Sequence, residues 1–218
     1  VYAVTGCTTN ETTRGGVVTT IERINTVTAN NPTIDTYGVY VWNQKTGQNS
    51  STTGTIYGIY DISGSVWEKT SSFVSNGDKN LLTHGKSLLD ETNVTYNMED
   101  ETISANTGTS TKYVTIYTSD DSKETVLDAA SQKNYGKNIK IYGDAIRETT
   151  HSNAGTSNEG WNTSSWDKDH SAFPALNCLF FDRGGSIWSA NNAGLFGFSY
   201  TAGNSRYING FRTVLIAK

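Results

Sequence analysis

Apolar and polar positions alternate most clearly near the C-terminus, over residues 194–200. Aromatic side chains occupy every second position of this segment, which is the period of a strand with one buried face. Phenylalanines on one face of a strand belong more often to a core than to a contact surface. We therefore expect Phe196, Phe198 and Tyr200 to face the core, and Gly197, Ser199 and Thr201 to face outward. Tyr200 lies at the strand end and can turn to either side.

Strands are also expected before and after this segment. The apolar run 176–181 precedes Gly184 and Gly185, and paired glycines suit a strand that bends sharply or lets another backbone approach closely. Residues 213–216 are apolar throughout, as in a strand buried on both faces. The intervening loop is rich in Asn, Ser, Tyr and Gly, a composition typical of recognition surfaces on rigid scaffolds.

The first third of the chain has weaker patterns. Residues 17–27 predict a short helix that ends at the Asn-Asn-Pro of residues 30–32. Residues 37–42 predict a strand.

The middle of the chain alternates polar segments with short apolar ones. Residues 113–117 predict a strand, and residues 120–122 predict the N-cap of a helix that runs to about Gln132. Residues 139–147 predict a strand followed by a short helical turn. A turn is expected at residues 75–78, and Gly85 interrupts the mixed apolar and polar segment that follows it.

Length and composition indicate a turn-rich globular protein with one large domain or two small ones, and argue against several function classes. With 218 residues the chain is long enough to bury a core, and its 21 glycines and 12 tyrosines argue against a helical bundle. A net charge of −4 without a basic run argues against nucleic acid as a partner. No apolar run is long enough to span a membrane. Neutral polar surfaces of this kind are common on secreted, cell-surface and phage structural proteins.

The residues that usually carry catalysis or bind metals form no recognisable cluster. Cys7 and Cys178 are far apart, and either one disulfide or two separate buried thiols fits them. Asp167 and Asp169, close to Trp161 and Trp166, have the composition of a glycosidase carboxylate pair, but their spacing on an irregular loop fixes no separation between the carboxyl groups. We expect these tryptophans to be part of the core.

Three motifs occur in a fixed order. Residues 58–68 read Gly-Ile-Tyr-Asp-Ile-Ser-Gly-Ser-Val-Trp-Glu, residues 183–186 read Arg-Gly-Gly-Ser, and residues 210–212 read Gly-Phe-Arg. Together they resemble the hallmarks of the formylglycine-generating enzyme (sulfatase-modifying factor) family. The resemblance implies a C-type-lectin-like α+β fold, with a small twisted antiparallel sheet and much irregular loop. It further implies a single domain over 1–218 in which 70–160 is a family-specific insertion.

The chain departs from the enzymes of that family where their chemistry resides. They carry two reactive cysteines shortly after Arg-Gly-Gly-Ser, whereas the matching positions here fall near Ser189 and Gly194. Neither a hydroxyl group nor a hydrogen atom can bind copper as a thiolate does. We therefore expect no copper and no oxidase activity. The first interpretation of the chain is then a non-catalytic binding module. The alternative is an enzyme, either a degenerate oxidase or a carbohydrate hydrolase. A purely structural subunit of a surface appendage is a third interpretation.

The non-catalytic members of the family imply a binding surface in the C-terminal segment. On this interpretation the partner is a protein or a glycan, and the protein belongs to a bacterial cell surface or a phage tail. Tyr and Trp supply rigid contact area, Asn and Ser supply adaptable hydrogen bonds, and an arginine can anchor a carboxylate. The expected ligand-binding residues are Trp188, Asn191, Asn192, Gly197, Ser199, Tyr200, Thr201, Asn204, Arg206, Tyr207 and Asn209.

Some of these family members are diversified by retroelements, which mutate adenines in Asn codons. The residue types reachable in this way dominate the segment between Arg-Gly-Gly and Gly-Phe-Arg. Trp188 is not reachable from an Asn codon by adenine changes alone. It is therefore either a fixed residue or an argument against diversification, and both interpretations stay open.

The turn at residues 61–68 has two interpretations. The resemblance implies a calcium ion held by the carboxylates of Asp61 and Glu68 and by carbonyl oxygens near Gly64 and Val66, and calcium accepts such hard oxygen ligands. Alternatively, Glu68 is buried and pairs with Arg183 or Arg212, whose guanidinium suits a carboxylate.

Overall fold

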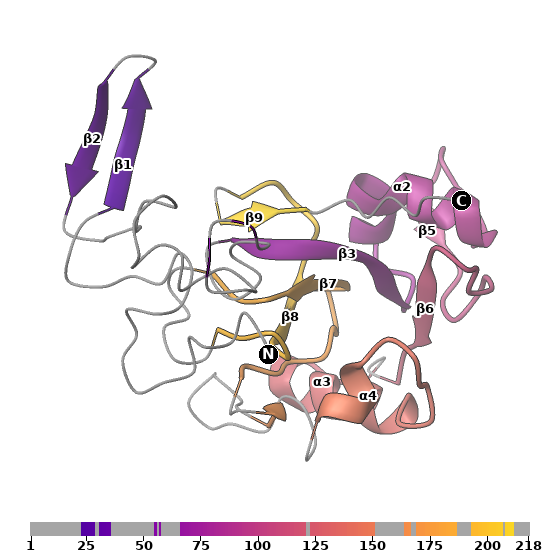
Figure 1. The fold of residues 1–218 in the computed structure, drawn as a ribbon. Coiled ribbons are helices and arrows are strands. Elements are labelled where there is room, and N and C mark those ends of the chain that lie inside the picture. Colours follow the sequence, from indigo (N-terminus) through magenta and orange to yellow (C-terminus); the bar gives the residue numbers. More distant parts are fainter. Residues whose placement is uncertain are drawn as a thin grey trace.

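The computed structural model describes residues 23–28, 31–35, 55, 57, 66–120, 123–150, 164–166, 169–186, 193–206 and 208–211. These residues form an α+β structure around one small twisted sheet (Figure 1). The strands of this sheet are β3 (Trp67–Ser75), β6 (Thr115–Thr118), β7 (Phe180–Arg183), β8 (Phe198–Thr201) and β9 (Asn209–Gly210). The expected α+β class is confirmed.

Strand β3 is the centre of the sheet, in the order β6-β3-β7-β8 with β9 also paired to β3. It is antiparallel to β7 and parallel to β6 and β9, so the sheet is mixed, and the expectation of an antiparallel sheet is wrong for these two pairings. Its second half is apolar, with Phe73 and Val74 fully buried. Because β3 continues to Ser75 and pairs with β6, residues 70–160 supply part of the central sheet and its helices.

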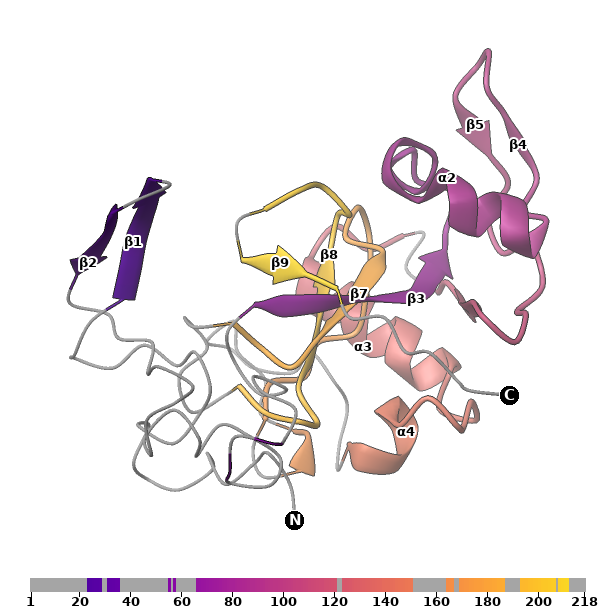
Figure 2. The same cartoon turned by 45° about the horizontal axis from the view of Figure 1, so that its top comes forward.

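Helices cover the sheet on two sides (Figures 1 and 2). Helix α2 (Asn80–Thr92) lies on one side, and Phe180 of β7 fills the space where a side chain at Gly85 would lie. Non-helical backbone at Gly85 kinks α2, so this glycine both interrupts the helix and lets it approach the sheet. Helices α3 (Leu127–Lys137) and α4 (Ile146–Thr149) lie on the other side.

An aromatic cluster fills the space between the sheet and α3. The ring of Phe173 lies 5.0 Å from that of Phe181, 5.1 Å from that of Tyr117 and 6.0 Å from that of Tyr135. The edge-to-face geometry of these pairs is the arrangement that aromatic rings favour. Phe198 is fully buried in the same core, which confirms the expectation that it is a core residue.

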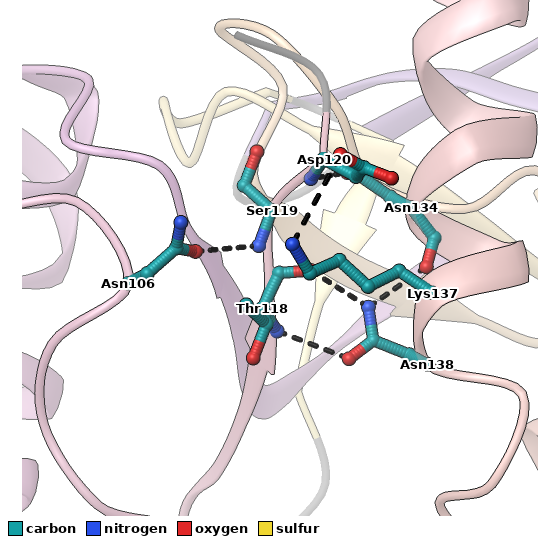
Figure 3. Close-up of polar contacts among 7 residues, drawn as sticks. All are labelled: Asn106, Thr118, Ser119, Asp120, Asn134, Lys137 and Asn138. Carbon is teal, nitrogen blue, oxygen red and sulfur yellow. Dashed lines mark hydrogen bonds and ion pairs between the residues drawn. The ribbon is translucent and has the colours of Figure 1, made fainter.

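Asparagine side chains form hydrogen bonds with the backbone at the end of β6 and just after it (Figure 3). The amide of Asn138 accepts a hydrogen bond from Thr118 N–H at 3.0 Å and donates to Thr118 C=O at 2.8 Å. Asn134 accepts from Asp120 N–H, and Asn106 accepts from Ser119 N–H. Asn134 and Asn138 thus occupy the outer edge of the sheet, where unpaired backbone groups would otherwise invite another chain, and Asn106 binds the same backbone from the opposite side.

We expect Asn138→Ala to lower the free energy of unfolding by about 2 kcal/mol, because two backbone groups of Thr118 lose their partner and the buried side chain of Asn138 is removed. Urea unfolding monitored by circular dichroism measures this change. The neighbouring Lys137→Ala is the control, since Lys137 makes only a 3.9 Å surface ion pair to Asp120, which should contribute less than about 1 kcal/mol. Equal effects of the two substitutions would contradict the role given to Asn138.

Two short hairpins complete the described elements. Strands β1 (Arg23–Thr28) and β2 (Asn31–Asp35) pair with each other, as do β4 (Tyr96–Asn97) and β5 (Thr102–Ile103). The helix expected over residues 17–27 is therefore wrong from residue 23 onward, because β-branched residues crowd this stretch and favour extended backbone. Residues 17–22 and the strands expected over 37–42 and 213–216 lie outside the described residues.

Other expected elements are present with shifted boundaries. The strand expected at 113–117 is β6, and the turn at 75–78 is confirmed with Gly77 at a φ of 86°. The helix expected from residues 120–122 begins instead at Leu127, because Val126 keeps an extended backbone. Residues 139–145 form no strand, and only the short helix α4 follows them. Among the described residues, no helix is long and apolar enough to span a membrane.

Candidate functional site

The three sequence motifs meet at Glu68. In the sheet register, Glu68 lies opposite Arg183 of β7 on one side and opposite Gly210 of β9 on the other. These residues are far apart in the sequence, so the sheet brings together the ends of all three motifs. Trp67 beside them is buried, and its ring packs edge-to-face against that of His170 at 6.0 Å.

Arg183 is held on the side of the sheet that faces α4. One of its N–H groups donates to the main-chain oxygen of Asp144, and its guanidinium lies 5.8 Å from the ring centre of Phe198. Burial lowers the pKa of Arg183, while the Asp144 carboxylate opposes this effect. The other arginine considered as a partner for Glu68, Arg212, lies outside the described residues.

Only part of the calcium site implied by the resemblance is described. Val66 and Glu68 are both half-buried, whereas Asp61 and Gly64 lie outside the described residues. Among the residues that the structure describes, no three His, Cys, Asp or Glu side chains are grouped so that they could hold a metal ion.

The paired glycines after β7 allow a close backbone approach. Gly184 and Gly185 both have a φ of 83°, a region that residues with a side chain rarely adopt. Gly184 N–H donates to Gly197 C=O at 3.1 Å, and Gly194 N–H donates to Gly184 C=O at 3.2 Å. The expected close approach is confirmed, and it closes the 194–197 turn onto the end of β7.

A buried carboxylate occupies the space next to Gly194. A Cβ atom at this position would lie 1.8–1.9 Å from the carboxyl group of Asp169, so no side chain can be present there without a rearrangement. Asp169 is fully buried, and its Oδ2 accepts a hydrogen bond from Phe196 N–H at 2.9 Å. Asp169 therefore supports this turn, while Asp167, its companion in the glycosidase interpretation, lies outside the described residues.

The alternation predicted for 196–200 is confirmed within β8, but its outward face is not open. Phe198 pairs with Arg183 and Tyr200 with Phe181, whereas Ser199 and Thr201 alternate with them on the opposite face. Thr201 and Gly197 are buried, so their expected place on an accessible surface is wrong. Backbone of the 194–197 turn packs against Gly197, and Thr201 lies beside Phe180, on the face that α2 covers.

The remaining expected ligand-binding residues differ in exposure. Arg206 is exposed, and Ser199, Tyr200, Asn204 and Asn209 are half-buried. Burial is the main reason that the pKa of Tyr200 is raised to about 12, so its hydroxyl group stays protonated at neutral pH. Those that lie outside the described residues are Trp188, Asn191, Asn192 and Tyr207.

A lysine and an aspartate beneath this surface were not predicted from the sequence. Lys69 lies opposite Asp182 in the β3–β7 register, and Asp182 lies opposite Ser199 in the β7–β8 register. The Lys69 ammonium donates to the main-chain oxygens of Gly203 and Asn204 at 2.8 and 3.0 Å. We call this pair of bonds the Lys69 clamp. It holds the turn that leads directly to Arg206.

Burial shifts the pKa values of both charged groups in this layer. Asp182 is only 4% exposed, and burial raises its pKa to about 6 although Lys69 and Arg206 oppose the shift. Burial likewise lowers the pKa of Lys69, against the attraction of Asp182. A sequence signal for this pair does not exist, because only the strand register brings Lys69 next to Asp182.

Two other expectations from the sequence have a clear outcome. Trp166 is 47% exposed and packs edge-to-face on Phe196 at 5.4 Å, so its expected place in the core is wrong; Trp161 lies outside the described residues. Cys178 is a half-buried free thiol whose pKa is raised by burial, which makes it a weak nucleophile at neutral pH. Cys7 lies outside the described residues.

Comparison with protein-family models, with curated proteins and with solved structures finds no match for this chain.

Proposed function

We propose that this chain is a non-catalytic ligand-binding module of the formylglycine-generating-enzyme type, with a C-type-lectin-like fold. Its binding surface comprises Ser199, Asn204, Arg206, Tyr207 and Asn209, together with Trp188, Asn191 and Asn192 from the loop before it. The partner is a protein or a glycan with an acidic group that binds Arg206. The module itself is displayed on a bacterial cell surface or a phage tail.

The observation that carries the proposal is the Lys69 clamp. An ammonium group hydrogen-bonded to the two successive carbonyl oxygens of Gly203 and Asn204 restrains this turn. Arg206, two residues further on, is exposed. A fixed turn lowers the entropy that binding costs, which is how rigid scaffolds present recognition loops.

Two further observations support the proposal, one on the absence of oxidase chemistry and one on the framework. The residue near which the second reactive cysteine is expected is Gly194, and the Asp169 carboxylate fills the space for its side chain. The adjacency of Glu68, Arg183 and Gly210 in one sheet supports a framework that brings the three motifs together. A framework without its sulfur ligands retains a surface for binding.

The test is an array that carries glycans and bacterial surface proteins, probed with the wild-type chain and with the double variant Arg206→Ala, Tyr207→Ala. We expect the double variant to lose about tenfold or more of the affinity for the spots that the wild type binds, because Arg and Tyr are the residues that most often dominate interfaces. Its melting temperature should stay within about 2 °C of the wild type, since Arg206 is exposed.

The matched control is Lys140→Ala with Tyr142→Ala, which also removes one cation and one tyrosine, both exposed, from the α3–α4 side. It should bind as the wild type does. Undiminished binding by the Arg206 and Tyr207 variant would contradict the proposed surface, and copper binding or turnover of peptide or glycan substrates would contradict the absence of catalysis.

Calcium at the 61–68 turn is tested by thermal melting of the protein with and without a chelator. An unchanged melting curve would exclude bound calcium.

A further inference from the structure

A polar pocket lies on the other side of the sheet from the Lys69 clamp. It has a volume of about 240 Å³ and lies between β3, β6, β7 and the start of α4. Arg183 lines it, and Arg183 follows Asp182 in β7 and therefore points to the opposite face. The pocket is also lined by the polar residues Thr70, Ser71, Ser72, Tyr113 and Asp144.

The pocket results from an irregularity in β3. Lys69 lies opposite Asp182 and Phe73 lies opposite Phe180, so Thr70, Ser71 and Ser72 together face the single residue Phe181. Bulges of this kind re-aim side chains and occur often beside binding sites. Here the bulge directs hydroxyl groups toward the pocket, and the hydroxyl oxygens of Thr70 and Ser72 lie 2.7 Å apart.

Asp144 and Arg183, which carry opposite charges, form adjacent parts of the pocket wall. Oδ1 of Asp144 accepts a hydrogen bond from Ile146 N–H at 3.1 Å, while Oδ2 is buried and has no hydrogen-bond partner among the described residues. Arg183 donates to the main-chain oxygen of Asp144, which uses one of the five N–H groups of a guanidinium. Burial raises the pKa of Asp144, partly offset by Arg183. The wall thus offers both hydrogen-bond donors and acceptors with little net charge.

An aromatic ring stands at the rim. Tyr113 is 66% exposed, although it directly precedes the buried residue Val114. The ammonium of Lys112 lies 4.6 Å from the centre of its ring. A tyrosine in this position offers an apolar ring and a hydroxyl group at little cost in conformational entropy.

We propose that this pocket binds one neutral pyranose ring of a saccharide. Hydroxyl groups of a sugar both donate and accept, which matches a wall built from hydroxyls, one carboxylate and one guanidinium. An anion is disfavoured because the Asp144 carboxylate adjoins Arg183, and a larger ligand exceeds the volume, which lies below the range of about 300–1,000 Å³ for drug-sized molecules. This site is independent of the surface around Arg206.

The experiment titrates the isotope-labelled full chain with glucose, galactose, mannose and N-acetylglucosamine at millimolar concentrations, and follows amide chemical shifts. We expect at least one sugar to shift the amides of residues 70–72, 113–115 and 144–146. Tyr113→Ala should weaken that binding by about tenfold. Tyr142→Ala should not, and Tyr142 is the matched control because it is also 66% exposed and does not line the pocket.

Several results would overturn the proposal. These are the absence of shifts with all four sugars, shifts that Tyr113→Ala leaves unchanged, or shifts that only an acidic sugar such as glucuronate produces. The titration is repeated with the Arg206→Ala variant, which should bind the sugar as the wild type does. Loss of binding in that variant would show that the sugar occupies the Arg206 surface instead, and would also overturn the proposal.

Discussion

Replacing Gly194 with alanine is expected to lower the free energy of unfolding by about 3 kcal/mol. The added methyl carbon would lie 1.8–1.9 Å from three atoms of the Asp169 carboxyl group, far inside any van der Waals contact. Asp169 cannot move into solvent to relieve this overlap, since it is fully buried and its Oδ2 holds the N–H of Phe196. Urea unfolding of the purified variant measures the change.

The matched control is Gly136→Ala. Gly136 lies in α3 and is exposed, and beyond its chain neighbours and the nearby backbone of its own helix no atom lies within 4 Å of the position of an added Cβ. Alanine there should raise the free energy of unfolding by about 0.5–1 kcal/mol, because glycine is a poor helix former. If Gly194→Ala were as stable as the wild type, Asp169 would not occupy the space beside residue 194, and the structural reason against a cysteine at this position would be lost.

Asp182→Asn is expected to stabilise the protein above pH 6 and to change its response to pH. The pKa of Asp182 is about 6 in the folded protein, against 3.8 for an ordinary aspartate, because the carboxyl group is buried. The folded state therefore binds this proton more tightly than the unfolded state does. The stability that results is present below about pH 4 and is lost as the pH rises through about 6.

The size of this effect follows from the shift. A difference of about two pKa units corresponds to about 3 kcal/mol at most. We expect the free energy of unfolding of the wild type, relative to that of the Asn variant, to fall by about this amount between pH 4 and pH 7. Urea unfolding of both proteins at several pH values measures it, with Glu91→Gln, an exposed acid on α2, as the control. A difference that does not change with pH would contradict the burial of a charged Asp182.

Some local features of the fold could be predicted from the sequence. The period of two over 196–200 gives the orientation of β8 because a strand alternates its side chains whatever it pairs with. The close approach at Gly184 was likewise predictable from the glycine pair. In contrast, β3 runs past Glu68 through Thr70, Ser71 and Ser72, which have the composition of a loop. Only its pairing with β6 and β7 keeps this stretch extended.

The candidate site depends on contacts between distant residues, so most of it could not be predicted. Lys69 and Asp182 become neighbours through the register of two strands, and no pattern along the chain signals this. Thr201 was expected on the outside because a period says which residues share a face but not which face is covered. The adjacency of Glu68, Arg183 and Gly210 likewise comes from the strand register, which neither composition nor periodicity along the chain predicts.

The measurement that tests the central proposal most directly is hydrogen exchange of the backbone amides, with and without the tightest partner found on the array. If the clamped turn presents the binding surface, protection should increase over residues 199–209 and stay unchanged in α2 and α3. Protection that instead appears in α2 or α3, with none at Asn204 or Arg206, would show that the protein recognises its partner elsewhere.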